Sequence, residues 1–484
     1  MNRRDPLSRR PRSAKVIPLV VDVDGTLIRT DLLHEASLQF LARHPAEAWR
    51  LLPWAMSGKA GLKAALANRV DPGCDTVPLC EEVVECIRAA QAEGRPVYLA
   101  SASDVRYVEL LAERIGGIAG TFGTEDGHNL SGVDKARRLS EYFGDQGFDY
   151  VGNDGVDIPV WQAARSQLVV STGRRFSAHV RKRFPEAEIL TEQGRGLDPY
   201  VRSLRVHQWA KNVLVFLPLI AGHTFDPDSL TRTVLAFFCF CMAASSAYVI
   251  NDLFDLPGDR AHHRKRNRPF ASGALPVSHG PAFAALLLGL ALIPTLLLPW
   301  WFTAVLTLYV TSTLTYSLYL KRQLLVDVIM LGALYTMRVL GGVAAVGVAQ
   351  SPWLLMFSLF LFLCLAIVKR CSELVARGEA GEAETIGRGY RVEDLNIMLG
   401  LGAAAGYGSV LVVALYIASP EVQRLYTDPM ALWLICPLLL YWVSRILILS
   451  NRNQLHDDPV VFALTDRASW VTGALSALVI AVAI

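Results

Sequence analysis

Acidic and basic side chains gather in residues 251–273, directly after a charge-free apolar run at residues 233–250. Asp252, Asp255 and Asp259 follow one another at spacings of three and four, which on a continuous helix put all three on one face. Crowded carboxylates repel one another unless a cation neutralises them, and Mg²⁺ takes carboxylate and phosphate oxygens together. Five cationic residues come next: Arg260, Arg264, Lys265, Arg266 and Arg268. The stretch predicts a site for Mg²⁺ and a phosphorylated substrate, since cations that only set membrane topology would not need three acids in phase.

A second set of reactive residues follows hydrophobic segments near the start of the chain. The first segment ends in Asp22-x-Asp24-Gly25-Thr26, and residues 96–100 lead into Ser101-Ala-Ser103. Lys135 comes next, and a third hydrophobic segment carries Asn153-Asp154-x-x-Asp157. In this order the motifs resemble those of the haloacid dehalogenase superfamily, which consists mostly of Mg²⁺-dependent phosphatases.

That resemblance implies a role for each motif residue. Asp22 would attack phosphorus and form an aspartyl-phosphate, while Asp24 would act as general acid and then as general base. Ser101 and Lys135 would hold the phosphate charge. The metal shell would consist of Asp22, Asp24 and Asp157, with Asn153 or Asp154. The family usually has Gly-Asp where this chain has Gly152-Asn153, so an inactive or regulatory domain is the alternative to an active phosphatase.

The elements that position these residues form the first of two predicted domains, residues 14–198. Strands alternating with helices predict an α/β fold with a Rossmann-like, doubly wound parallel sheet and a site at the carboxyl ends of its strands. Residues 32–86 are expected to be mainly helical, and their place resembles that of the small helical cap of the superfamily. Residues 172–204 are interpreted as a basic connector on lipid headgroups.

The second predicted domain, residues 199–484, consists mainly of apolar runs. The whole chain has 484 residues, 52% of them hydrophobic, and a net charge of +3, which is too small to favour nucleic acid. Runs of membrane-spanning length predict nine helices in an all-α bundle. These lie at residues 209–224, 231–251, 280–299, 301–319, 325–348, 352–369, 395–418, 429–449 and 467–484.

Cations mark the loops after the second, fourth, sixth and eighth of these helices. The positive-inside rule therefore predicts a multi-pass protein of the cytoplasmic membrane, with both sites facing the cytoplasm. The Arg-rich N-terminus is not followed by an apolar segment, so no signal peptide is expected. The eight cysteines form no C-x-x-C pair, and we expect reduced thiols.

Polar residues also collect at the cytoplasmic ends of the predicted spans. Ionisable groups at membrane depth are costly, so they become functional candidates unless they snorkel to the surface or join helices. These candidate substrate-binding residues are Lys211 and Asn212 at the first span, Asn251 at the second, Lys321 after the fourth, and Lys369, Arg370 and Glu373 at the sixth.

The aspartate stretch and the membrane region together resemble the UbiA prenyltransferase superfamily of nine-helix intramembrane enzymes. Three motifs are more specific: Arg205-x-x-Gln-Trp-x-Lys211-Asn212, the run from Asp259 to Gly273, and Lys369-Arg370-x-x-Glu373-Leu374. They resemble the decaprenyl-phosphate phosphoribosyltransferases, which transfer 5-phosphoribosyl from phosphoribosyl diphosphate to a polyprenyl phosphate. His263 stands where those enzymes usually have Pro.

By this resemblance, Asp252, Asp255 and Asp259 would hold Mg²⁺, and Arg260, Lys265, Arg266 and Arg268 would bind the phosphates of phosphoribosyl diphosphate. Lys211, Lys369 and Arg370 would position the lipid phosphate. The first domain would then remove the 5-phosphate of the product. Alternatives are prenylation of an aromatic acceptor from a polyprenyl diphosphate, and a non-catalytic scaffold or transporter. Fewer acids and more cations around Lys369 favour two phosphorylated substrates. The sequence does not predict the oligomeric state.

Overall fold

Six parallel strands form the sheet of the first part of the chain, in the order β3-β2-β1-β4-β5-β6. The computed structural model describes residues 16–483 except 126, 172, 193–195, 223, 348–350, 380–388, 421, 423–425 and 456–458. The predicted boundaries at residues 14, 348 and 484 lie outside the described residues. The strands are β1 (Leu19–Val21), β2 (Val97–Asp104), β3 (Gly120–Thr124), β4 (Asp149–Gly152), β5 (Ser166–Ser171) and β6 (Glu188–Glu192). The predicted parallel α/β sheet is confirmed.

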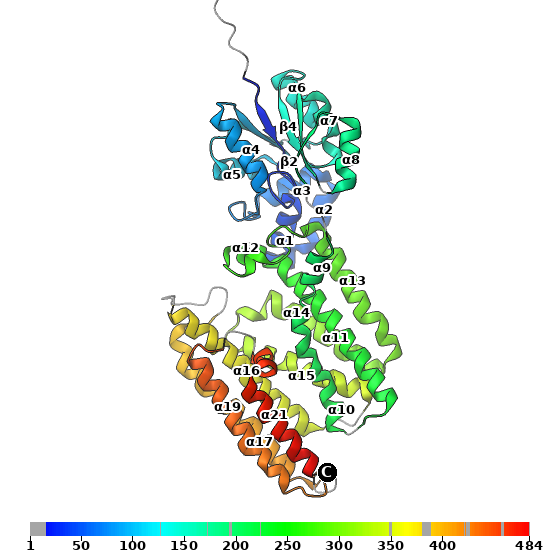
Figure 1. Ribbon diagram of the computed structural model, residues 1–484, viewed down its shortest axis with the longest axis vertical. Coiled ribbons are helices and arrows are strands. Elements are labelled where there is room, and N and C mark those ends of the chain that lie inside the picture. The colour runs from blue at the N-terminus through cyan, green and yellow to red at the C-terminus, as the bar shows by residue number, and fades with distance from the viewer. Residues whose placement is uncertain are drawn as a thin grey trace, which may run out of the picture. The chain divides into compact units, whose positions relative to one another are not determined.

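Helices cover both faces of this sheet, because alternate residues of its central strand face opposite sides. Leu19 and Val21 of β1 pack with residues of α4 (Glu81–Ala92) and α5 (Val105–Ile115). Val20 packs on the other side, with residues of α6 (Val133–Phe143), α7 (Ile158–Ala163) and α8 (Arg174–Arg183). The two groups of helices are visible on either side of the strands in Figure 1.

The inserted segment after β1 is helical, as predicted. It contains α1 (Leu32–Arg43), the 3₁₀-helix η1 (Pro45–Arg50), α2 (Leu51–Met56) and α3 (Gly58–Ala67). Asp31 caps α1 by accepting a hydrogen bond from the backbone N–H of His34. The buried face of α1 includes Leu32 and Phe40 but also the polar side chains of Glu35 and Gln39.

The region interpreted as a connector contains regular structure that the sequence reading missed. Helix α8 and strand β6 complete the sheet, and α9 (Asp198–Ser203) follows. Val180 of α8 is buried while the cationic residues 181–183 are mostly exposed. The many cations of this short helix, with its single apolar face, led to its interpretation as a basic connector.

The aspartate stretch does not form one continuous helix. Helix α11 (Pro227–Phe254) ends before Asp255, and α12 (Leu256–Ala261) begins after it. Pro257 explains the break, because a proline inside a helix lacks an N–H donor and its ring clashes with the carbonyl four residues earlier, here that of Leu253. The premise that one helix aligns all three aspartates is therefore wrong. The stretch continues with two 3₁₀-helices, η4 (Lys265–Asn267) and η5 (Val277–His279).

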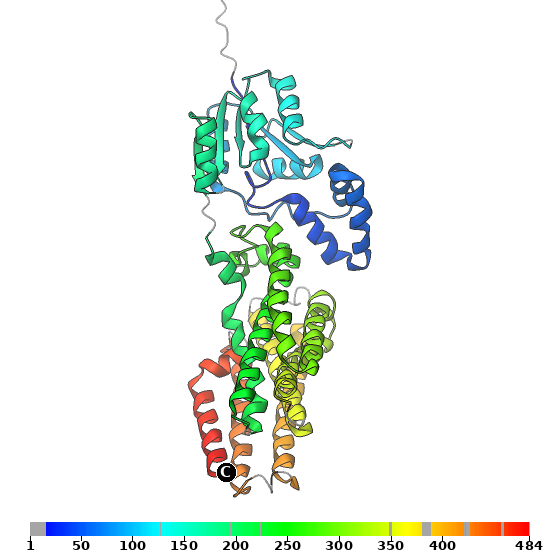
Figure 2. The same ribbon diagram turned by 90° about the vertical axis from the view of Figure 1, so that its right-hand side faces the viewer.

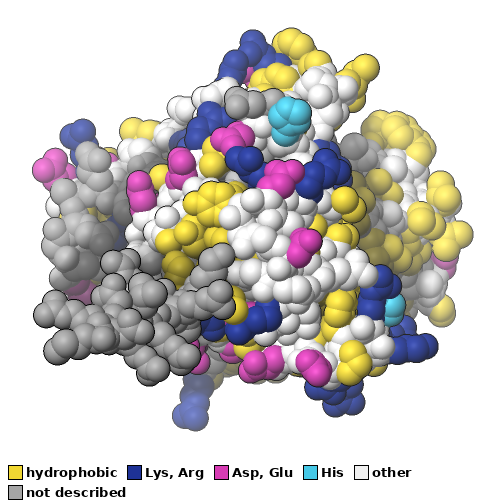
Figure 3. All heavy atoms as spheres, turned by 90° about the horizontal axis from the view of Figure 1, so that it is seen from above, with side chains coloured by type: hydrophobic (Ala, Val, Ile, Leu, Met, Phe, Trp, Pro, Cys, Tyr) yellow, Lys and Arg dark blue, Asp and Glu magenta, His cyan; other side chains and the backbone are white. Residues whose placement is uncertain are grey.

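The chain divides into two compact units. The first comprises Met1–Ser203 together with Asp252–Pro281, and the second comprises Leu204–Asn251 together with Ala282–Ile484. The segment Asp252–Pro281, which the sequence assigns to the membrane domain, thus packs with the α/β domain. On the face drawn in Figure 3, Lys and Arg side chains are interspersed with Asp and Glu, in keeping with the small net charge.

The second unit is a helical bundle, with long helices running side by side in Figure 2. One buried cluster joins α15 (Val326–Val346), α16 (Pro352–Glu379), α17 (Leu395–Ile417) and α19 (Ile435–Asn451). Besides these four helices and α11, the bundle consists of η3 (Val206–Phe216), α10 (Leu217–Ala221), α13 (Gly280–Leu292), η6 (Ile293–Leu297), α14 (Trp300–Leu318), η7 (Leu320–Arg322), η8 (Val392–Asp394), η9 (Ala431–Leu434), α20 (Pro459–Thr465) and α21 (Arg467–Ala483).

Six helices among the described residues are long and apolar enough to cross a membrane. They coincide with six of the nine predicted spans, so the nine-helix count is not confirmed. In place of the predicted first span, η3 and α10 form a 3₁₀-helix followed by one short α-helix. Pro218 at the start of α10 and the polar residues of η3 suit such an irregular segment.

Candidate functional site

The carboxyl ends of β1, β2 and β4 bring the first set of candidate residues together. Asp22 directly follows β1, and its backbone N–H donates to the carbonyl of Val151 in β4 at 2.9 Å. Its carboxylate is 5% exposed and accepts two hydrogen bonds. Oδ1 accepts from Lys135 Nζ at 2.7 Å, and Oδ2 accepts from Thr26 Oγ1 at 2.9 Å. A carboxylate held at both oxygens has a fixed orientation, as an attacking nucleophile needs.

Asp24 is held by a different group of donors. Its Oδ2 accepts from Ser101 Oγ and from Ser103 Oγ, each at 2.7 Å. Its Oδ1 accepts from the backbone N–H of Leu32, the first residue of α1, at 2.8 Å. The predicted general acid and the predicted phosphate-binding serine therefore lie in hydrogen-bond contact, at the base of the cap.

Lys135 and Asp157 complete this cluster from α6 and the 3₁₀-helix η2 (Gly155–Asp157). Lys135 is 4% exposed, and its Nζ also lies 3.0 Å from the Tyr150 hydroxyl. That hydroxyl donates to Asp157 Oδ1 at 2.8 Å. Asp157 Oδ2 accepts from the backbone N–H groups of residues 153 and 154. Asp157 thus shapes the loop after β4 as well as adding negative charge.

Burial dominates the electrostatics of these carboxylates. It raises the pKa of Asp22 to about 7, although the neighbouring Lys135 charge acts in the opposite direction. Burial also raises the pKa of Asp24, and the charge of Asp31 adds to the effect. For Lys135 the charges of Asp22 and Asp157 outweigh the effect of burial, so its pKa lies above the ordinary value. An acid with a raised pKa is suited to proton transfer near neutral pH.

The donor set of this cluster fits Mg²⁺, which prefers carboxylate and carbonyl oxygens. Asn153 is the residue after β4 that faces the catalytic loop, because a Cβ on Gly25 would lie 2.2 Å from its side-chain amide. Asp154 is exposed, and its carboxylate accepts the N–H of Gly155. We find no group of three His, Cys, Asp or Glu side chains arranged to hold a metal within the described residues. The assignment of Asp22, Asp24, Asn153, Asp154 and Asp157 to such an ion stays a prediction.

In the aspartate stretch, two carboxylates converge on one guanidinium. Arg268 Nη1 lies 2.5 Å from Asp259 Oδ2 and 3.2 Å from Asp252 Oδ1. Both aspartates are buried, with 2% and 3% of their surface exposed. Burial raises the pKa of Asp259 against the opposing effect of Arg268. Carboxylate oxygens that meet at one positive group also suit a divalent cation. Asp255 lies between these two aspartates in the sequence, at the break between helices α11 and α12.

The other cations of this stretch differ in exposure. Lys265 and Arg266 are exposed, as phosphate-binding side chains can be. Arg260 is 8% exposed and forms an ion pair with Glu35 of α1. The predicted phosphate-binding roles of all three stay predictions.

In the second unit, Lys211 and Asn212 lie on η3 near an arginine of α15. Asn212 is fully buried, and its Oδ1 accepts from Arg338 Nε at 2.8 Å. Arg338 also donates to the hydroxyl of Tyr309 at 2.8 Å. Lys211 is 7% exposed, with its Nζ 5.8 Å from the centre of the Tyr335 ring. These contacts join η3, α14 and α15 through polar side chains.

A second polar cluster joins the ends of α14, α15 and α16. Arg370 is 2% exposed and contacts Asp327 with two nitrogens, at 2.5 and 3.1 Å. It also donates to Glu373 Oε2 at 2.6 Å, and Tyr316 donates to Asp327 at 2.7 Å. Two of the predicted residues, Arg370 and Glu373, are thus brought together. Of the remaining candidates, Asn251, Lys321 and Lys369 are partly buried on α11, η7 and α16.

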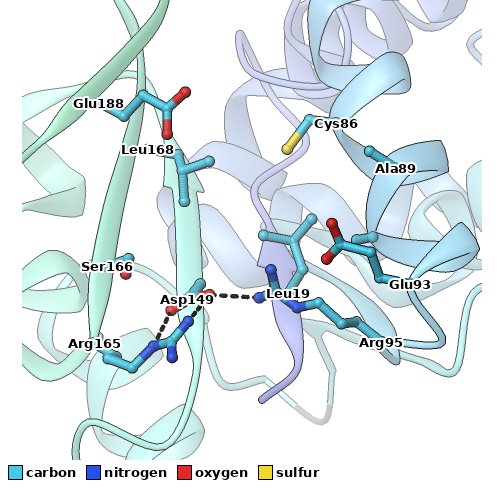
Figure 4. Close-up of a pocket in the computed structure, with 11 residues that line it drawn as sticks. Leu19, Cys86, Ala89, Glu93, Arg95, Asp149, Arg165, Ser166, Leu168 and Glu188 are labelled. Carbon is cyan, nitrogen blue, oxygen red and sulfur yellow. Dashed lines mark hydrogen bonds and ion pairs between the residues drawn. The ribbon is translucent and has the colours of Figure 1, made fainter. Parts of the chain in front are cut away.

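Two cavities lie away from these clusters. One, of about 300 Å³, is lined by Leu19, Asp149 and Ser166, which are the first residues of three strands (Figure 4). It therefore opens at the amino-terminal edge of the sheet, opposite the aspartates. Arg95 and Arg165 both pair with Asp149 there. The other cavity, of about 510 Å³, is apolar and lies between α14 and α15.

Several residues that contact the candidates were not among the predicted site residues. Glu35, Ser103 and Tyr150 each contact a predicted site residue. Asp327 had one signal, a carboxylate among apolar residues, and Glu35 had another, an acidic residue on the buried stripe of an amphipathic helix. Neither feature predicts which side chain the carboxylate contacts.

Comparisons with known proteins agree with both predicted resemblances. Residues 212–470 match the UbiA prenyltransferase family, and residues 19–160 match the haloacid dehalogenase-like hydrolases. The uncharacterized protein y4nM of Sinorhizobium fredii is 38% identical over 95% of this chain and 90% of its own length. Decaprenyl-phosphate phosphoribosyltransferase of Mycolicibacterium smegmatis is 37% identical over 36% of this chain and 56% of that enzyme.

A solved structure of a UbiA homolog from Archaeoglobus fulgidus, bound to GPP and Mg²⁺, aligns with 59% of this chain and 98% of its own. Its sequence identity is 19% and the TM-score is 0.45. The six apolar helices and the two family matches make the protein a multi-pass membrane transferase with a hydrolase-like domain. The chain belongs to the UbiA prenyltransferase family and carries a haloacid dehalogenase-like domain ahead of its membrane domain.

Proposed function

We propose that the membrane domain transfers 5-phosphoribosyl from phosphoribosyl diphosphate to a polyprenyl phosphate, and that the hydrolase domain then removes the 5-phosphate. The observation that carries the proposal is the convergence of Asp252 and Asp259 on one cationic group, in a segment with further exposed cations. The similarity to decaprenyl-phosphate phosphoribosyltransferase supports the choice of substrates.

For the transfer step, an oxygen of the lipid phosphate attacks C1 of the ribose while the bond from C1 to diphosphate breaks. Mg²⁺ held by Asp252 and Asp259 would neutralise the charge of the departing diphosphate. Arg268, Lys265 and Arg266 bind phosphate oxygens, and a guanidinium does so with two parallel hydrogen bonds. Lys211 and Lys369 orient the lipid phosphate, and the apolar cavity between α14 and α15 takes part of the prenyl chain.

For the hydrolytic step, Asp22 attacks the phosphorus of the 5-phosphate, and the bond to the ribose oxygen breaks. Asp24 gives that oxygen a proton, for which the pKa raised by burial suits it, although the hydrogen bonds from Ser101 and Ser103 act in the opposite direction. Asp24 then takes a proton from water, which attacks the aspartyl-phosphate and releases inorganic phosphate. Lys135 neutralises charge on Asp22 and on the transferring group. Mg²⁺ bound beside Asp22 and Asn153 would add further positive charge.

We further propose that both reactions take place at the cytoplasmic face of the cytoplasmic membrane. The loops that carry most of the cations of the membrane domain support this orientation. Phosphoribosyl diphosphate is a soluble, highly charged molecule, so its binding residues must face water.

The test is mass spectrometry of the lipids formed by the full-length protein from phosphoribosyl diphosphate, polyprenyl phosphate and Mg²⁺. The wild type should form ribosyl-phospho-lipid, Asp22→Asn should form the phosphoribosyl lipid, and Asp252→Asn should form neither. Asp145→Asn, which neutralises an exposed acid of the hydrolase domain, is the matched control. Unchanged consumption of phosphoribosyl diphosphate by Asp252→Asn would exclude the transfer. Dephosphorylated lipid from Asp22→Asn would exclude the hydrolytic role.

The second candidate function is prenylation of an aromatic acceptor, as the family name suggests. In that case the protein would consume a polyprenyl diphosphate and leave phosphoribosyl diphosphate intact. A second incubation with a polyprenyl diphosphate, an aromatic acid and Mg²⁺ distinguishes the two, because the lipid product would then carry an aromatic ring and no ribose.

A further inference from the structure

A buried ion pair joins two parts of the first unit that lie 225 residues apart in the sequence. Glu35 of α1 is completely buried, and the side chain of Arg260 in α12 is 3% exposed. Arg260 Nη2 lies 2.5 Å from Glu35 Oε1, and Nη1 lies 3.3 Å from Oε2. Both oxygens are therefore held in a bidentate contact, which fixes direction as well as distance.

On the hydrolase side, this pair reaches the turn that positions Asp24. Thr30 Oγ1 donates to Glu35 Oε1 at 2.6 Å. The backbone carbonyl of Thr30 accepts from Gly25, and the N–H of Leu32 donates to Asp24. Glu35 is thus connected to the predicted general acid through a single turn of chain.

On the transferase side, the pair reaches the carboxylates that converge on Arg268. Arg260 directly follows Asp259 and also donates from Nε to the carbonyl of Ala271 at 3.2 Å. The same segment touches the hydrolase domain again at Gly273, where a Cβ would lie 2.6 Å from Cβ of Arg29. Gly273 has φ +74°, a conformation that favours glycine, so this second contact is also closely specified.

We propose that Glu35 and Arg260 are positioning residues that fix the aspartate-bearing segment on helix α1, so that the geometry of Asp252 and Asp259 depends on the hydrolase domain. The activity readout of this inference rests on the proposed phosphoribosyl transfer. An arginine that donates to both oxygens of a carboxylate in a buried site holds its own backbone in place. The chain thereby links its transfer site to the turn beside its hydrolytic site.

The experiment combines hydrogen exchange with kinetics on the full-length protein. The variants are Glu35→Gln, Arg260→Gln and the double variant, with Glu47→Gln as control. Glu47 pairs with Arg69 at 2.9 Å in the same inserted segment but is partly exposed and lies outside this contact. Circular dichroism and the thermal midpoint of unfolding check that each variant folds.

We expect Glu35→Gln to raise amide exchange in residues 256–275 and to lower kcat for phosphoribosyl transfer roughly tenfold to a hundredfold, the cost of a small misplacement. KM for phosphoribosyl diphosphate should change little, because Glu35 binds no substrate. The double variant should lose no more than the worse single variant, since each removes the same contact. Glu47→Gln should match the wild type.

The opposite pattern would overturn the inference. If exchange and kcat are unchanged in Glu35→Gln while Arg260→Gln raises KM for phosphoribosyl diphosphate, Arg260 binds phosphate directly and positions nothing. A wild type that forms no lipid product from phosphoribosyl diphosphate would refute the proposed function instead. Exchange in residues 256–275 would still decide the positioning role in that case.

Discussion

Replacing Arg268 by Gln should strengthen the binding of Mg²⁺ and weaken the binding of phosphoribosyl diphosphate. In the structure its guanidinium occupies the point where Asp252 and Asp259 converge, at 3.2 and 2.5 Å. A divalent cation bound by the same oxygens must compete with it, whereas a bound diphosphate would gain a donor from it. Arg268→Gln therefore removes a competitor of Mg²⁺ and a ligand of phosphoribosyl diphosphate in one substitution.

The magnitude follows from the contacts that are lost. Hydrogen bonds to a charged group contribute about 1.5–3 kcal/mol, and the Arg268 side chain is 23% exposed, so solvent screens it only partly. Every 1.4 kcal/mol corresponds to about tenfold in a binding constant. Mg²⁺ binding in the absence of substrate should therefore tighten by roughly 10- to 150-fold, and KM for phosphoribosyl diphosphate should rise by a similar factor.

Calorimetric titration of the full-length protein with Mg²⁺, followed by initial rates at saturating Mg²⁺, measures both constants. Because the hydrolase site is also proposed to bind Mg²⁺, the titration should be made in an Asp22→Asn background. Arg264→Gln is the matched control, since Arg264 is an exposed cation of the same segment and its loss changes the net charge equally. The reasoning fails if Arg268→Gln leaves the Mg²⁺ constant unchanged or weakens it, or if both variants behave alike.

Three further outcomes can be measured. Asp149→Asn should destabilise the hydrolase domain by about 1.5–3 kcal/mol at pH 7 in pulse proteolysis. Burial alone would raise the pKa of Asp149, but Arg165 outweighs it and holds the pKa below its usual value. The contribution of ionised Asp149 to the free energy of unfolding is therefore complete above its unfolded-state pKa. The difference in stability between wild type and Asp149→Asn should vanish as the pH falls through the pKa of Asp149 in the folded protein. Lys63→Met removes a cap amine that donates to the carbonyl of residue 102. This substitution should raise KM for hydrolysis of the phosphomonoester, and the rate of phosphoribosyl transfer should stay unchanged. Arg370→Lys cannot keep both contacts with Asp327, so the thermal midpoint of the membrane domain should fall by about 2–4 °C per kcal/mol lost; an unchanged midpoint contradicts this.

The hydrolase site could be predicted largely from the sequence because its residues follow the ends of parallel strands. That architecture brings segments distant in sequence to one edge, so Asp22, Asp24 and Ser101 were expected together, and the structure places them so. Lys135 was expected there as well and contacts Asp22. The resemblance to the haloacid dehalogenase motifs supplied the roles of these residues, and the parallel strands supplied their common edge.

The membrane clusters were less predictable, because tertiary contacts decide which polar side chains meet. The spacing of Asp252, Asp255 and Asp259 suggested one helical face, but Pro257 ends the helix and Arg268 returns from nine residues beyond Asp259 to join two of the carboxylates. Helix α8 and strand β6 were missed for a similar reason. A short segment with one apolar face gives too weak a signal when charged residues surround it.

Exposure separates two kinds of cation that the sequence treats alike. Arg260 and Arg370 are buried in bidentate contacts with carboxylates. Arg260 joins α12 to α1, which is distant in the sequence, and Arg370 joins the consecutive helices α15 and α16. Lys265 and Arg266 are exposed and close to the converging aspartates in sequence. Leaving a buried carboxylate unpaired costs several kcal/mol, so a substrate phosphate would have to overcome that cost to recruit Arg260 or Arg370. Exposed cations have no such cost, which makes Lys265 and Arg266 the better candidates for phosphate binding and leaves the buried arginines to hold the geometry of the site.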